Sequence, residues 1–76
     1  RYTLSVEVMS GSYFDGKTVS ELLLPERCEI INIHRDRKDI PPAKQKLVPG
    51  DQVQIEMDAQ DIEKLYEPLV SMANIY

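Results

Sequence analysis

A cluster of basic side chains is the strongest candidate for binding chemistry in this sequence. Between Arg35 and Lys46 five bases stand against two acids, a local charge of +3, whereas the whole chain of 76 residues carries −4. Guanidinium groups bind two phosphate oxygens at once, so Arg35 and Arg37 suit an anionic ligand. Ile30 and Ile31 precede them and could pack on a flat organic ring. The alternative is a solvated, charged hairpin without a ligand.

A second candidate is the segment Gly11–Thr18, which has the spacing of a phosphate-binding P-loop. Such a loop needs a buried strand before it and a long helix after it, within a large parallel sheet. Pro25 leaves room for only one or two helical turns. A plain loop that leads into a helix cap is therefore the favoured interpretation.

Other residues with reactive side chains favour structural roles. His34, Asp36 and Asp39 are of the types that bind metals or carry protons, but they fall in a predicted turn and on a strand. Cys28 has no partner for an internal disulfide, and with one histidine nearby it falls short of a zinc site. A buried, inert thiol is favoured. We therefore predict no enzyme activity, no catalytic residue, no metal site and no cofactor.

Charge and composition restrict the cellular compartments and the classes of partner that suit this chain. A net charge of −4 argues against long nucleic acids or anionic membranes as the main partner. A single cysteine fits a reducing compartment, no apolar run approaches the ~20 residues of a membrane span, and no signal peptide opens the chain. We expect a cytoplasmic domain. Because the sequence opens on Arg1 rather than methionine, we also expect it to be a piece of a larger protein with a membrane portion elsewhere.

Hydrophobic alternation predicts four strands. They cover residues 2–8, 28–35, 39–42 and 52–57. Pro41 and Pro42 lack N–H donors, which confines the third of these strands to an edge of the sheet.

Two helices are predicted as well. Thr18 and Glu21 form a capping box, after which Leu22 and Leu23 share a buried face until Pro25 ends the first helix. The second helix begins at Asp58, has apolar residues at helical spacing over 62–69, and contains Pro68, which should kink it. The apolar tail 69–76 is expected to pack on the sheet, on a partner subunit or on another domain.

The order of elements predicts a small two-layer α+β sandwich, β-α-β-β-β-α, with a mostly antiparallel sheet and both helices on one side. Residues 1–76 form one domain. Along 28–35 a regular strand would place Ile31 and Ile33 on one face and Cys28 and Ile30 on the other. The second apolar face could be covered by a partner subunit or within the monomer, and a core this small favours a partner or an attached neighbour.

Four short motifs, taken in order, resemble the TrkA-C (RCK C-terminal) domain family. Gly16–Leu22 is similar to its G-K-[ST]-[LV]-x-E-L element, and Ile31–Arg35 to its second strand. Ile40–Pro42 resembles its edge strand, and Leu47–Val53 resembles its L-x-x-G-D-x-[LV] turn. The resemblance runs from about Tyr2 to Leu65.

The resemblance implies a cytoplasmic regulatory domain attached to an inner (plasma) membrane transport protein. Family members belong to potassium-uptake regulators, potassium channels, cation antiporters, chloride-channel-like proteins and other anion transporters. It also implies a homodimer whose cleft, in some members, binds a small nucleotide effector such as cyclic di-AMP. A purely structural dimerisation domain without a ligand is the alternative.

The resemblance also implies a set of ligand-binding residues near the second and third strands. They fall on Ile30, Ile31, Arg35 and Pro42, and the basic segment adds Arg37. The family commonly has a glycine near the position of Arg37. We expect Arg35→Ala to weaken anion binding without unfolding the domain, and Ile33→Asp to unfold it.

Overall fold

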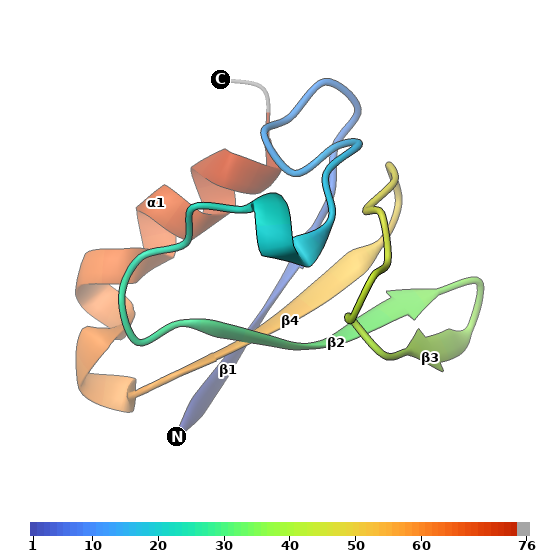
Figure 1. Cartoon of the computed structure of the whole chain (residues 1–76). Helices are drawn as coiled ribbons and strands as arrows, with labels where there is room; N and C mark the ends of the chain where they lie inside the picture. Colours follow the sequence, from blue (N-terminus) through green and yellow to red (C-terminus); the bar gives the residue numbers. More distant parts are fainter. Residues whose placement is uncertain (75–76) are drawn as a thin grey trace.

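Four antiparallel strands form one sheet in the computed structural model, which describes residues 1–74 (Figure 1). In chain order they are β1 (Tyr2–Glu7), β2 (Glu29–Arg35), β3 (Lys38–Ile40) and β4 (Gln52–Met57). In space the order is β1-β4-β2-β3, so the last strand of the sequence lies in the middle. The helix α1 (Ile62–Ala73) follows. The α+β class and the antiparallel sheet are confirmed.

The core lies on one face of this sheet. Val53, Ile55 and Met57 of β4 are fully buried, while the residues between them point to the other, more exposed face. Phe14 from the loop after β1 and Leu69 from α1 are buried in the same cluster. The covering layer is therefore built from α1 together with the irregular segment between β1 and β2.

A β-bulge in β2 changes which of its side chains are buried. Ile30 pairs with Ile55 and Asn32 with Gln54, so Ile31 has no partner of its own. The extra residue restores Ile33 to the face of Ile30, and both are buried in the core. The prediction that Ile30 and Ile33 lie on opposite faces was wrong. Ile31, at the bulge, is a large apolar side chain that is 39% exposed.

The first predicted helix is a single 3₁₀ turn, η1 (Val19–Glu21). The N–H of Thr18 donates to Oε1 of Glu21 at 2.8 Å, as the capping box predicts, and the Thr18 hydroxyl donates to the same oxygen at 2.9 Å. Leu22 then turns to extended backbone and is buried, whereas Leu23 is 84% exposed. The prediction that Leu23 lies on a buried helix face was therefore wrong, because the helix ends before reaching it.

The second predicted helix extends beyond the predicted range 62–69 and is not interrupted. A 3₁₀ turn, η2 (Ala59–Asp61), precedes it, and α1 passes through Pro68 without a break. Asp58 stands before η2, but its side chain makes no capping hydrogen bond. None of the helices in residues 1–74 has the length and apolarity that a membrane crossing requires. Residues 75–76, the end of the predicted apolar tail, lie outside the described part of the chain.

A two-residue turn joins β2 to β3. Its central residues, Asp36 and Arg37, have φ angles of 51° and 66°, the signature of a type I′ turn. The pairing of Arg35 with Lys38 closes the hairpin. Left-handed backbone costs a non-glycine residue about 1–2 kcal/mol, and arginine gains nothing locally from it.

Arg37→Gly is expected to raise the free energy of unfolding by about 0.5–1 kcal/mol, because glycine adopts positive φ without steric cost. Urea denaturation measures the change. The matched control is Lys38→Gly in the extended strand β3, which should lower stability by a similar amount. Destabilisation by both substitutions would contradict the turn geometry.

Candidate functional site

The basic segment lies at the β3 edge of the sheet and in the loop that follows β3. Arg37, Lys38, Lys44 and Lys46 are exposed, and Arg35 is half-buried. Lys44, like Arg37, has a positive φ, 64°. Two of the four exposed basic residues, Arg37 and Lys44, therefore have strained, left-handed backbone. Such strained residues are more frequent at functional sites than elsewhere.

Arg35 forms a two-pronged ion pair with Asp51. Its Nε donates to Oδ1 and its Nη2 to Oδ2, both at 2.7 Å. Nη2 also donates to the carbonyl oxygen of Lys46 at 2.9 Å, and the N–H of Val48 donates to Oδ2 at 3.0 Å. The side chain of Asp51 is 1% exposed, against 25% for Arg35. These hydrogen bonds allow the carboxylate to stay ionised within the core.

The pair shifts the pKa of both partners. Burial alone would raise the pKa of Asp51, but hydrogen bonds from Arg35 and Val48, together with the arginine charge, lower it below its ordinary value. The hydrogen bond to Asp51 raises the pKa of Arg35. Asp51 is thus an anion with its own cation, and Arg35 contributes little net charge to the surface.

The turn before β4 explains how Asp51 reaches this position. The N–H of Asp51 donates to the carbonyl of Val48 at 3.2 Å, and Gly50 has a φ of 94°. Pro49 followed by glycine is the residue pair that a type II turn requires. The Leu-Val-Pro-Gly-Asp motif therefore has a structural role, which is to place the carboxylate beside Arg35.

The five predicted ligand-binding residues lie in different layers. Ile30 is 5% exposed and belongs to the core, whereas the bulge residue Ile31 is 39% exposed. Arg37 stands at the tip of the hairpin, and Pro42 is half-buried after β3. Within residues 1–74, Nη1 of Arg35 has no hydrogen-bond acceptor. Ligand binding by these residues stays a prediction.

A polar network on the outer face of the sheet was not predicted. Asn32 donates to Oδ1 of Asp39 at 3.0 Å and to Oε1 of Gln54 at 3.2 Å, and Nδ1 of His34 lies 3.0 Å from the same Asp39 oxygen. The hydrogen bonds from Asn32 and His34 lower the pKa of Asp39. His34 and Asp39 are direct partners across the hairpin. Counting back from a two-residue turn would have revealed this pairing.

In the P-loop-like segment Gly11–Thr18, most donors already have acceptors, either inside the segment or elsewhere in the protein. The N–H of Gly11 donates to Oδ2 of Asp15 at 2.9 Å. The amine of Lys17 donates to the carbonyl of Tyr13 at 2.7 Å and lies 4.3 Å from the centre of its ring. The carboxylate of Asp15 therefore binds the Gly11 N–H that a phosphate would need. The amine of Lys17 is directed at Tyr13 of the same loop and not at a ligand site.

Cys28 is half-buried, in a hollow that it shares with two arginines and two carboxylates, Arg1, Arg27, Glu29 and Asp58. Burial, and then the negative charge of Asp61, raise the pKa of its thiol. A protonated thiol is a poor nucleophile and a poor metal ligand. Over residues 1–74 no three side chains of histidine, cysteine, aspartate or glutamate gather where they could hold a metal ion.

Comparison with known proteins gives two matches. The family model described as TrkA-C domain matches residues 4–70. The Trk system potassium uptake protein TrkA homolog of Archaeoglobus fulgidus is 36% identical over 63 residues, which cover 82% of this chain and 14% of that protein. The chain thus spans a small part of the length of this relative.

Arg35→Ala is expected to lower the free energy of unfolding by about 2–4 kcal/mol, because it leaves the carboxylate of Asp51 buried without its cation. This expectation replaces the one drawn from the sequence, that the substitution would leave the fold intact. Urea denaturation at pH 7 measures the loss. The control is Arg37→Ala, an exposed position whose substitution should change stability by less than about 0.5 kcal/mol. Equal stability of the two variants would show that the pair contributes nothing.

The pair also predicts how stability depends on pH. Because the pKa of Asp51 is lowered by folding, its contribution is complete above the ordinary aspartate pKa of about 3.9 and is lost as the pH falls through the lower, folded value. The stability difference between the wild type and Asp51→Asn should therefore shrink as the pH falls below about 4. Denaturation at several pH values tests this. A difference that stayed constant would exclude ionisation of Asp51 as its cause.

Proposed function

The chain belongs to the TrkA-C domain family, and from this we propose that it is a non-catalytic regulatory domain of a larger ion-transport protein. The family match over residues 4–70 carries the proposal. The name of the relative, a potassium uptake protein, makes potassium transport the first candidate, ahead of cation antiport and chloride-channel-like proteins. The domain acts on the cytoplasmic side of the inner (plasma) membrane, joined to a membrane transport domain.

Regulation works through two copies of the domain. A ligand that binds one arrangement of the two subunits more tightly than another shifts the population toward it, and the attached transport domain follows. The small size of the core supports a homodimer, because a domain this small gains stability from a partner. The exposed apolar side chain of Ile31 on β2 supports it to a lesser degree.

The effector is a small anion, with cyclic di-AMP as the first candidate, and it binds beside the β2–β3 hairpin. Arg37 meets a phosphate group, and Nη1 of Arg35 supplies a further donor. Ile31 and Pro42 offer apolar surface for a base. The support is the local excess of basic residues and the unused guanidinium donors. Ile30 contributes only from the core beneath.

A purely structural role is the second candidate function. In that case the domain holds two transporter subunits together and the hairpin remains a solvated, charged loop. The Arg35–Asp51 pair favours this alternative to some extent, because it shows that one of the two key arginines has a structural partner.

Cyclic di-AMP at a hundredfold excess over its Kd is expected to stabilise the wild-type chain by about 2.7 kcal/mol, which a thermal shift assay detects. Arg37→Gly should abolish this shift, because it removes the phosphate-binding cation while keeping the turn relaxed. Calorimetry then gives the affinities.

The matched control is Lys64→Ala, which removes an exposed cation from α1. It should bind as the wild type does. An unchanged affinity in Arg37→Gly would place the site elsewhere. No response to cyclic dinucleotides, nucleotides or cations would favour the structural role.

A further inference from the structure

One edge of the sheet, that of β1, has no partner among the described residues. The N–H of Val8 donates to Asp51 at 2.8 Å, so the backbone groups of Val8 face β4. Backbone groups alternate in direction along an antiparallel strand. Those of Thr3, Ser5 and Glu7 therefore point away from the sheet.

The two edges of the sheet are protected very differently. The opposite edge strand, β3, has three residues and is followed at once by Pro41 and Pro42. Short length and prolines are the usual means of preventing another strand from pairing. β1 has six residues, with no proline, and it pairs with β4 without a bulge. Only this edge is left open to a further strand.

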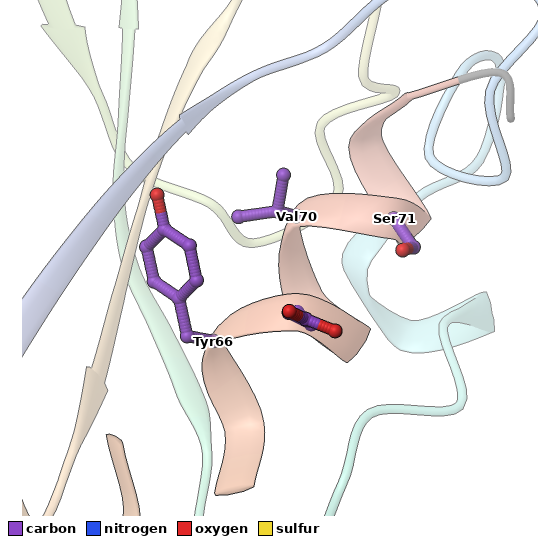
Figure 2. A pocket seen from close by; sticks show the side chains of 4 residues that line it. Tyr66, Val70 and Ser71 are labelled. Carbon is purple, nitrogen blue, oxygen red and sulfur yellow. The ribbon is translucent and has the colours of Figure 1, made fainter. Parts of the chain in front are cut away.

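A groove lies along α1, the helix that packs on β1. It has a volume of about 400 Å³ and is lined by Tyr66, Glu67, Val70 and Ser71. Figure 2 shows Tyr66 and Val70 projecting from α1 on the side of the strands, and α1 packs directly on β1. Tyr66 is 50% exposed. An open strand edge beside a half-apolar helix groove is the arrangement by which domains bind extended peptides.

We propose that β1 and this groove bind an extended segment of a partner polypeptide, which adds a fifth strand to the sheet. The segment donates to and accepts from the backbone of Thr3, Ser5 and Glu7. Its inward side chains lie against Tyr66 and Val70. This site is at the opposite edge of the sheet from the proposed effector site and does not depend on it.

Charge and exposure define the chemistry of the partner. The groove residues include one carboxylate, Glu67, while Glu63 and Lys64 stand one helical turn earlier, so this part of α1 keeps an excess of one negative charge. The segment therefore has apolar residues at alternate positions and carries lysine or arginine. A second copy of this chain is a poorer occupant, because Leu4 and Val6 of its β1 are buried in its own core and cannot fill the groove.

The test is an NMR titration of the labelled chain with a capped peptide of about eight residues, in which leucine alternates with lysine and threonine. The amide signals of Thr3, Ser5 and Glu7 should shift, and their exchange with deuterium should slow. The methyl signals of Val70 should shift as well. A peptide N-methylated at alternate residues should bind at least about tenfold more weakly, because it cannot pair with the strand.

Two charge reversals provide the matched comparison. Glu67→Lys should weaken binding about tenfold, while Glu26→Lys, which makes the same change in net charge outside the groove, should leave it unchanged. Equal weakening by both would overturn the proposal, as would equal binding of the N-methylated peptide or shifts confined to β3. Absence of binding at about 1 mM peptide would overturn it too. Concentration-dependent shifts of the β1 amides without peptide would assign the edge to a second copy instead.

Discussion

Asp51, together with its partner Arg35, joins three segments of the chain, which are the end of β2, the loop between β3 and β4, and the residue after β1. It binds Arg35 at the end of β2 and the N–H of Val48 in the turn before β4. The same arginine holds the carbonyl of Lys46 in the loop after β3, and the backbone carbonyl of Asp51 accepts the N–H of Val8 beyond β1. A buried charge is tolerated only when it is paired and hydrogen-bonded. The loop, the turn and the ends of three strands must therefore all be in place together.

This constraint divides the basic segment into two parts with different physical behaviour. Arg35 is held by Asp51 and is close to neutral as a pair, so it orders the base of the hairpin. Arg37 and Lys44 are exposed, stand on left-handed backbone and form no ion pair within residues 1–74. The positive potential of the hairpin thus comes from its tip and from the following loop, supported on a rigid base.

The sequence was sufficient where local pattern and tertiary structure agree. Alternation located β1, β2 and β4, and the prolines placed β3 at an edge, although the strand ends at Ile40, before both prolines. The sequence was insufficient at Ile31, where β2 has a bulge. A bulge depends on the pairing with the neighbouring strand, so the alternation within one strand does not reveal it. The sequence also failed to pair Arg35 with Asp51. Sixteen positions separate them, and nothing local distinguishes a structural arginine from a ligand-binding one.

The position of β4 at the centre of the sheet determines when folding can begin during synthesis. β1 and β2 both pair with β4 and have no pairing with each other. On the ribosome, where roughly 5–20 residues are added each second, the chain up to Ile40 can form no sheet beyond the β2–β3 hairpin. β1 therefore has to wait, unpaired, until β4 has emerged. The sheet therefore folds in one late step, after β4 has been synthesised, and does not build up from the N-terminus strand by strand.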